Sequence, residues 1–291
     1  MGRMKLRIGA CVLSVIAMCW VAAEPGGAEG KETELSALSD SRSAGFDPWG
    51  ATHHRWPSLV DLHIGQEEHY YYWSRPNQRS LLRERTDTNP LNIWVGGDSL
   101  AGGPALGFRE LVREGGWVYT EDVRKSTGVV SDWYFDWRKH LEEEVADGPY
   151  EVIVLSIGGN DWQGFRGGPT EKGSAEWAEK YLQRIQEIFQ ILDRPGRLLI
   201  WVGMPHFKVP FMVPLTDVVN AITREVFSNG ERSVWVNAAS IVSPGGAWTK
   251  HVMRENGELL EVRTDDGTHY QSSGARLITD AVVAAVALKT G

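Results

Sequence analysis

The stretch that decides the fold is NIWVGGDSLAGG, residues 92–103. Its first residues are mostly apolar, as in a buried strand, and Gly96, Gly97, Asp98 and Ser99 follow at once. Strands buried on both faces belong to parallel sheets, where they read as continuous apolar runs. Gly, Asp and Ser also form ordinary turns. Whether Ser99 closes a turn or acts as a nucleophile depends on the rest of the chain.

From residue 91 onward, short apolar runs alternate with amphipathic segments. The runs that indicate strands, besides 92–96, are 151–157, 197–203 and 233–237, with a further short strand near 117–120. Alternating strands and helices predict βαβ units and a parallel sheet. We therefore expect an α/β protein, a three-layer α/β/α sandwich around a central, mainly parallel, flavodoxin-like sheet.

Apolar residues spaced four apart predict the helices. One stripe consists of Trp133, Trp137, Leu141 and Val145, and another of Trp177, Tyr181, Ile185, Ile188 and Leu192. A third helix is expected at 216–229, with Thr216 as its N-cap and Gly230 just past its end. The last helix begins near Ser272.

The N-terminus reads differently from the rest of the 291-residue chain. Residues 1–23 combine three basic residues, an apolar run and small residues before a polar segment, which is typical of a secretory signal peptide. We expect residues 24–45 to be a flexible spacer, 46–90 an aromatic-rich N-terminal extension, and 91–291 the α/β domain. The protein is thus expected to be exported to the periplasm, the cell envelope or the medium, with no integral membrane domain.

Charge and cysteine content exclude several functions. The formal net charge is -8 and the pI is near 5.5, so no nucleic-acid partner is expected. The two cysteines, Cys11 and Cys19, both fall in the predicted signal peptide, so the exported chain has none. Cysteine catalysis and metal thiolate sites are therefore excluded. His53 and His54 have no third ligand at a useful spacing, and we expect neither a metal nor any other cofactor.

Polar residues follow the predicted strands at the edge where an open parallel sheet binds its ligands. Ser99 follows the first strand, Asn160 stands in GGND after another, and Asp266 and His269 stand in DDGTHYQSSG before the last helix. A serine attacks only when a base takes its proton, and a carboxylate orients that base. Donors for an oxyanion could come from the Ser99 N–H, the Asn160 amide and the N–H of Gly128 in RKSTGVV.

In these motifs the chain resembles the SGNH, or GDSL, hydrolases, and more closely an exported bacterial subgroup of them. The resemblance covers residues 92 to about 288 and rests on GGDSLAGG, KSTGVV, GGND and DGTH, in that order. It implies the SGNH hydrolase fold, a triad of Ser99, His269 and Asp266, and an oxyanion hole of Ser99, Gly128 and Asn160. The usual α/β-hydrolase elbow is excluded, because Ala101 stands where that motif has its second glycine.

Several neighbouring residues have two interpretations. Asp98 is expected to brace the nucleophile loop, and Asp265 is an alternative to Asp266 as the orienting acid. Asp161 is expected to be structural, with substrate contact as the alternative. Trp133 is expected in the core through its spacing, with a place lining the substrate cleft as the alternative. His206 follows a strand and is a candidate substrate contact.

We therefore expect an exported serine esterase that hydrolyses an O-acyl ester, such as O-acetyl, on a cell-envelope or extracellular glycan or on a small ester. An O-acyltransferase acting on the same glycans is one alternative, and a non-catalytic glycan-binding protein is another. A lipase would need an apolar lid, for which 205–215 is the only candidate segment. The oligomeric state is left open.

Overall fold

The computed structural model describes residues 72–73, 81–169, 171–254 and 256–290, all within the compact unit Asp47–Gly291. The predicted signal peptide, the spacer, His53 and His54 lie outside the described residues, as does most of the predicted extension. Among the residues described, none of the helices has the length and apolar character needed to cross a bilayer.

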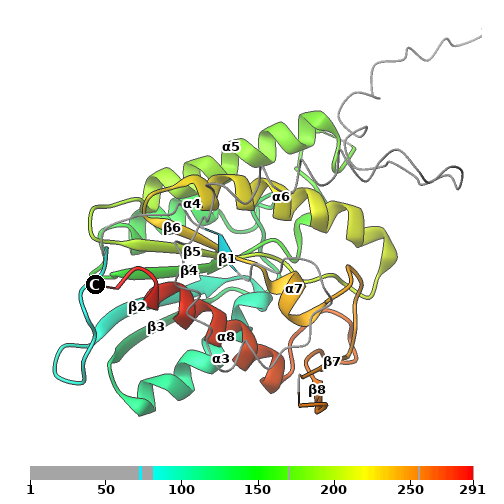
Figure 1. Ribbon diagram of the computed structural model, residues 1–291. Helices are drawn as coiled ribbons and strands as arrows, with labels where there is room; N and C mark the ends of the chain where they lie inside the picture. Colours follow the sequence, from blue (N-terminus) through cyan, green and yellow to red (C-terminus); the bar gives the residue numbers. More distant parts are fainter. Residues whose placement is uncertain (1–71, 74–80, 170, 255, 291) are drawn as a thin grey trace, which may run out of the picture. The chain divides into compact units, whose positions relative to one another are not determined.

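A six-stranded sheet forms the middle layer, in the order β1-β6-β5-β4-β2-β3 (Figure 1). Its strands are β1 (Tyr72–Trp73), β2 (Leu91–Gly97), β3 (Trp117–Val123), β4 (Val152–Ser156), β5 (Leu198–Val202) and β6 (Ser233–Val236). β2 to β6 run parallel, and β1 pairs antiparallel with β6. The mainly parallel sheet predicted from the sequence is confirmed.

Helices cover both faces of the sheet (Figure 1). They are α3 (Gly102–Leu111), α7 (Ala238–Val242) and α8 (Ser272–Ala287) on one face, and α4 (Trp137–His140), α5 (Ala175–Leu192) and α6 (Val213–Asn229) on the other. A small hairpin, β7 (His251–Met253) with β8 (Leu259–Glu261), precedes α8. The predicted three-layer sandwich is therefore confirmed.

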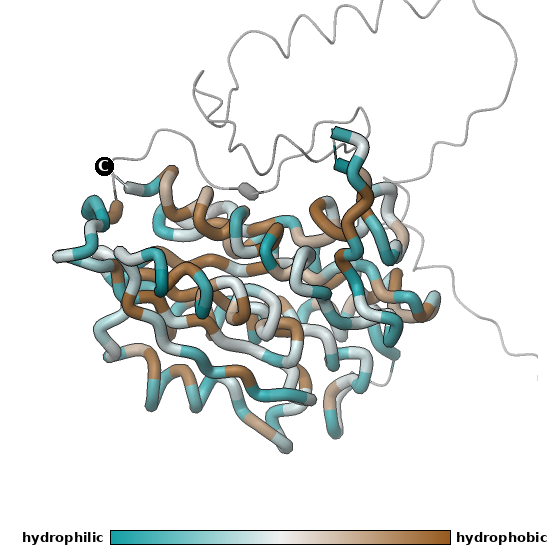
Figure 2. Tube along the Cα trace, turned by 90° about the horizontal axis from the view of Figure 1, so that it is seen from below, coloured by the Kyte–Doolittle hydropathy of each residue, from teal (hydrophilic) through white to brown (hydrophobic). Residues whose placement is uncertain are grey.

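The core consists of two apolar clusters, one on each side of the sheet. In β2, Ile93 and Val95 belong to the cluster beneath α3 and α8, whereas Trp94 belongs to the cluster beneath α4 and α5. Successive side chains of a strand point to opposite faces, so a strand covered on both faces needs an unbroken apolar run. In Figure 2 the helices are banded teal and brown, as expected when each packs only one face inward.

Two predicted helix starts are wrong. Trp133 does not begin a helix: α4 begins at Trp137, because the Asp136 carboxylate caps it by accepting from Arg138 N at 3.0 Å and from Lys139 N at 3.4 Å. Trp137 and the π-helical segment η3 (Leu141–Val145) do bury their part of the stripe.

The helix predicted from Thr216 begins one turn earlier. Pro214 stands in the first turn of α6, where its fixed φ favours helix and its missing N–H costs nothing. Thr216 therefore lies inside the helix, and its hydroxyl donates to Met212 O at 2.8 Å.

Candidate active site

Three of the candidate residues follow three neighbouring parallel strands. Gly97 at the end of β2 lies opposite Val123 of β3 and Ser156 of β4. Ser99, Gly128 and Asn160 come directly after these strands, so their loops lie at one edge of the sheet. This is the edge at which open parallel sheets bind ligands.

The Asp98 carboxylate ties the nucleophile loop to the loop of Asn160. Its Oδ1 accepts from Leu100 N at 2.8 Å, and its Oδ2 accepts from Gly158 N at 2.9 Å and Gly159 N at 2.8 Å. Asp98 is completely buried, and this burial raises its pKa to about 6, although the three backbone donors act in the opposite direction. Asp98 thus braces the loop, as expected from the sequence.

Gly97 allows the chain to leave β2 toward Ser99. Its φ is +143°, a conformation that side chains rarely adopt, and a Cβ there would lie 2.0 Å from Ser156 O. Ser99 then opens the short helical turn η1 (Ser99–Ala101), which runs directly into α3. The nucleophile loop therefore packs directly against the backbone of β4.

The side chain of Asn160 points to the neighbouring loop. Its Nδ2 donates to Thr127 O at 2.9 Å, so the loop with Gly128 is joined to the loop with Asn160. An amide nitrogen carries two N–H groups. Thr127 O takes one of them, and the other has no acceptor among the residues that the structure describes, so it is available to a ligand.

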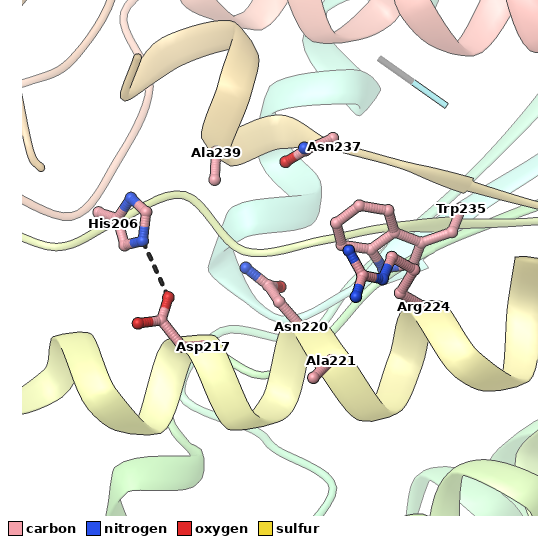
Figure 3. A pocket seen from close by; sticks show the side chains of 8 residues that line it. All are labelled: His206, Asp217, Asn220, Ala221, Arg224, Trp235, Asn237 and Ala239. Atoms are coloured by element: carbon pink, nitrogen blue, oxygen red, sulfur yellow. Dashed lines mark hydrogen bonds and ion pairs between the residues drawn. The ribbon is translucent and has the colours of Figure 1, made fainter. Parts of the chain in front are cut away.

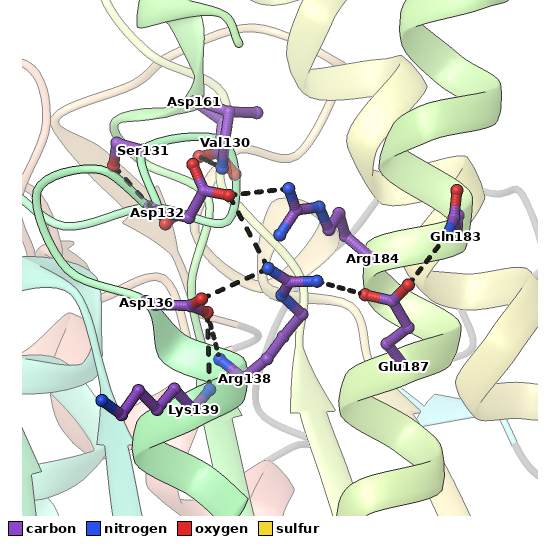
Figure 4. Close-up of polar contacts among 11 residues, drawn as sticks. Val130, Ser131, Asp132, Asp136, Arg138, Lys139, Asp161, Gln183, Arg184 and Glu187 are labelled. Atoms are coloured by element: carbon purple, nitrogen blue, oxygen red, sulfur yellow. Dashed lines mark hydrogen bonds and ion pairs between the residues drawn. The ribbon is translucent and has the colours of Figure 1, made fainter. Parts of the chain in front are cut away.

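Asp161 is bonded within the protein, as expected for a structural residue, and its alternative role as a substrate contact stays a prediction. It is completely buried; Oδ1 accepts from Val130 N at 3.1 Å (Figure 4), and Oδ2 accepts from Tyr181 Oη at 2.7 Å. A Cβ on Gly128 would lie 2.2 Å from Asp161 Oδ1, so this carboxylate fits against a position that only glycine can occupy. Asp161 therefore fixes the place of the Gly128 loop.

His269 and Asp266 form a hydrogen-bonded pair. His269 Nδ1 lies 2.7 Å from Asp266 Oδ2, which assigns the proton to Nδ1 and leaves Nε2 without a hydrogen bond in the described part of the chain. Partial burial raises the pKa of Asp266, but hydrogen bonds from Thr264 Oγ1, the His269 ring and two backbone N–H groups outweigh it and hold the pKa below its usual range. Asp266 is therefore ionised beside the imidazole.

Asp265 is not the orienting acid. It is 85% exposed and pairs with Lys250 Nζ at 2.7 Å, away from the histidine. Of the two acids that the sequence left open, Asp266 is the one bonded to His269.

The histidine loop packs against the helix that follows Ser99. A Cβ on Gly103, in the first turn of α3, would lie 2.5 Å from the ring of Tyr270, the residue after His269. No hydrogen bond joins Ser99 to His269 among the described residues. In unliganded enzymes this contact is often long and shortens when substrate binds.

Arg263 organises the histidine loop, and the sequence reading missed it. Its guanidinium is completely buried and donates to the carbonyls of His206 at 3.0 Å, Thr268 at 2.9 Å and His269 at 3.3 Å. Burial lowers its pKa. The only local signal is an arginine directly before the polar TDDGTH run, and nothing in that run shows that the side chain is buried.

His206 lies in a cavity of about 210 Å³ at the carboxyl ends of β5 and β6 (Figure 3). Its Nε2 is 3.0 Å from Asp217 Oδ1, and only 8% of the residue is exposed. Asn220, Arg224, Trp235 and Asn237 are among the other residues that line the cavity. His206 is thus held by Asp217, and its predicted role as a substrate contact stays a prediction.

The segment 205–215 is tied to the histidine loop. Lys208 N donates to Gly267 O at 3.0 Å, and Phe207 is buried in the core. Phe211, at the tip, is 69% exposed. The base of the segment is therefore held in place. A lid has to move to admit substrate, so this anchoring does not favour a lid.

Solved structures resemble this chain at low sequence identity. A GDSL-like lipase from Bacteroides thetaiotaomicron is 12% identical, with a TM-score of 0.46, over 70% of this chain and 91% of that one. A putative acylhydrolase from Bacteroides fragilis is 13% identical, with a TM-score of 0.46, over 71% and 90%. A variant of an acetyl xylan esterase from Geobacillus stearothermophilus is 14% identical, with a TM-score of 0.44, over 67% and 94%.

Sequence comparison identifies a family whose function is unknown. No curated protein sequence matches the chain. A family model described as a protein of unknown function, DUF459, matches residues 92–285. The match begins at the strand before Ser99, takes in Asn160, Asp266 and His269, and ends inside α8. Since it spans about two-thirds of the sequence, the chain belongs to the DUF459 family.

Proposed function

We propose that this protein is a serine ester hydrolase of the SGNH type. Ser99 Oγ attacks the ester carbonyl carbon while His269 Nε2 takes its proton, and Asp266 stabilises the resulting imidazolium. The observation that carries the proposal is the His269–Asp266 pair, hydrogen-bonded at 2.7 Å, on a loop packed against the helix that begins beside Ser99.

The oxyanion of the tetrahedral intermediate is bound by the N–H groups of Ser99 and Gly128 and by the second N–H of Asn160 Nδ2. When the intermediate collapses, the proton on His269 goes to the leaving alcohol, and an acyl–Ser99 ester remains. A water molecule, deprotonated by His269, then attacks this ester. When the bond to Ser99 Oγ breaks, His269 returns that proton to Ser99, and the acyl group leaves as a carboxylic acid. These donors are fixed before substrate arrives, because Asp98, Asp161 and Thr127 hold their loops in place.

We propose an O-acylated glycan, with acetyl as the acyl group, as the substrate, and export through residues 1–23. Support comes from the signal-like N-terminus and from aromatic side chains exposed at the same edge of the sheet, including Trp133. The side chains of His269 and Asp266 are 43% and 50% exposed, so water reaches the base, as hydrolysis requires.

The test is hydrolysis of p-nitrophenyl acetate by the purified protein and by Ser99→Ala. We expect the variant to lose on the order of 10³-fold or more of the turnover, because the nucleophile is gone. Ser228→Ala, which removes an exposed hydroxyl at the far end of α6, is the matched control and should retain wild-type turnover.

Equal rates for wild type and Ser99→Ala would contradict the proposal. If turnover depends on Ser99 but rises when a glycan acceptor is added, and the acyl group appears on that glycan, the protein is an acyltransferase. Glycan binding with no turnover of any ester would show a binding protein.

A further inference from the structure

Exposed apolar side chains gather at the edge of the sheet that carries Ser99. Of the large hydrophobic residues that are exposed in the described chain, five stand on the loops after β3, β4 and β5: Trp133, Tyr134, Trp162, Val209 and Phe211. Exposed apolar patches mark sites of ligand or partner binding. Three of the five are aromatic residues on the two loops that also carry Gly128 and Asn160.

Trp133 is exposed although its loop is firmly anchored. The preceding residue, Asp132, accepts from Arg184 at 2.7 Å and lies 3.6 Å from Arg138 (Figure 4). Asp136 caps α4 and lies 3.2 Å from Arg138. Between these anchors Trp133 is 54% exposed and Tyr134 59%. Their exposure is therefore part of an ordered structure, since ion pairs to α4 and α5 hold both sides of the loop.

Trp162 is presented in the same manner on the neighbouring loop. It follows the buried Asp161, whose carboxylate is held by Tyr181 and Val130, and it is 40% exposed. The two loops also meet at the surface, because the guanidinium of Arg166 lies 5.4 Å from the centre of the Trp133 ring. The two tryptophans thus belong to one surface beside Asn160.

Each tryptophan has a cation beside its ring. Arg166 lies over Trp133, and Lys172 Nζ is 5.8 Å from the centre of the Trp162 ring. Within the described residues, neither cation has a carboxylate at ion-pair distance. The whole chain carries a net charge of -8, so two cations without acidic partners mark this surface as suited to an anion.

We propose that Trp133, Trp162, Arg166 and Lys172 form a platform that binds an anionic glycan, with carboxylate-bearing sugars such as uronic acids. The indole faces accept the C–H face of a sugar ring, and the two cations pair with sugar carboxylates. Trp162 is two residues from Asn160, so a chain bound here passes beside the oxyanion site. This inference rests on the proposed function, which it deepens by naming the class of glycan.

The experiment measures the binding of acidic polysaccharides to a variant that lacks the proposed nucleophile. Calorimetric titrations of Ser99→Ala use polygalacturonate and hyaluronate, and the carboxyl-reduced forms of the same two polymers serve as uncharged partners. We expect at least one acidic polymer to bind ten times or more tighter than its reduced form. Raising the salt concentration should weaken this binding, as expected for exposed charges.

Two sets of variants in the Ser99→Ala background locate the binding. Trp133→Ala and Trp162→Ala should each weaken binding fivefold or more, and so should the double variant Arg166→Gln with Lys172→Gln. Phe211→Ala removes an aromatic ring that is even more exposed, at 69%, and that has no cation over it among the described residues. Arg113→Gln removes an exposed cation two residues past the end of α3. Both controls should bind within twofold of the parent, and thermal unfolding checks that every variant is folded.

Three results would overturn the inference: no binding of either acidic polymer, equal binding of their reduced forms, or equal losses in the Phe211→Ala control. Hydrolysis of p-nitrophenyl acetate by the wild type tests the proposed function separately. Turnover without polymer binding refutes only the platform, and platform-dependent binding without turnover refutes only the esterase.

Discussion

At the scale of single residues, the side-chain nitrogen of Asn160 donates one hydrogen bond to the protein, and we propose that its second N–H binds the substrate. Its Nδ2 donates to Thr127 O at 2.9 Å. This bond fixes the orientation of the amide, so that its nitrogen, and not its oxygen, lies toward the Gly128 loop. Such a donor stabilises charge that develops only in the transition state. Its loss should therefore lower kcat much more than it changes KM.

We expect Asn160→Ala to lower kcat by on the order of 10²-fold, which is typical of an oxyanion-hole donor. The measurement is steady-state kinetics on p-nitrophenyl acetate. Asn256→Ala, at the turn before β8, is the control, because within the described part of the chain its side chain bonds only to the nearby Glu258 N. Wild-type kcat in Asn160→Ala would remove this amide from the oxyanion site.

The candidate site could be located from the sequence, but the surroundings of its residues could not. Ser99 and Asn160 could be placed at one edge because each follows a strand of a parallel sheet, and His269 was added through its motif before the last helix. Whether a polar residue faces solvent or a buried partner depends on residues far along the chain. The buried Asp161 accepts a hydrogen bond from Tyr181, and the buried Arg263 donates to carbonyl groups of two different loops. Local spacing contains no sign of such partners.

At the scale of elements, the glycine-rich run between β2 and α3 contains two glycines that differ in whether their position tolerates a side chain. Gly97 has a φ of +143°, and a Cβ there would lie 2.0 Å from Ser156 O. Gly102, at the start of α3, has helical φ and ψ, and a Cβ there would meet nothing within 4 Å. The loop therefore requires glycine at position 97, whereas position 102 could hold a residue with a side chain.

We expect Gly97→Ala to lower the free energy of unfolding by on the order of 2–4 kcal/mol and to displace Ser99, because backbone strain and a steric clash combine. Gly102→Ala should be neutral or stabilising by up to about 1 kcal/mol, since alanine favours helix. Urea denaturation with activity measurements checks both. Equal stabilities of the two variants would show that the β2–β4 contact is not tight.

The elements themselves were predictable where their apolar pattern is complete. The strands β2, β4, β5 and β6 and the helix α5 are buried along a whole face and show it in the sequence. β3 was underestimated: it lies at the edge of the sheet, and polar residues such as Thr120 and Glu121 continue its pairing to Val123. The start of α4 depends on the cap at Asp136, which overrides the four-residue spacing from Trp133.

At the scale of the whole molecule, two buried acids make stability depend on pH. Burial raises the pKa of Asp98 to about 6 and that of Asp161 to about 7, and the Asp98 charge adds to the shift of Asp161. In the unfolded chain both acids titrate near 3.8. Between these values the folded protein binds more protons than the unfolded chain, so stability falls as pH rises from about 4 to about 7.

We expect Asp161→Asn, which cannot titrate, to lose less stability than the wild type across this range. An asparagine can still accept from Val130 N and can donate to Tyr181 Oη, so the local packing is kept. The difference should reach at least about 1 kcal/mol between pH 4.5 and pH 7.5, measured by urea denaturation. Parallel stability curves for the two proteins would show that the Asp161 carboxyl does not titrate in this range.

The segment between β1 and β2 is bonded to the residues that follow α8. The N–H groups of Leu81 and Leu82 donate to Lys289 O at 2.9 and 2.8 Å, and Leu82 pairs with Thr290. A short linker could therefore join residue 290 to residue 81, without β1, with the chain reopened in the exposed turn at Gly245. In such a circular permutant the proposed triad would read acid, histidine, serine along the chain. The spatial arrangement of the three groups would be unchanged, because chemistry depends on their geometry and not on their order.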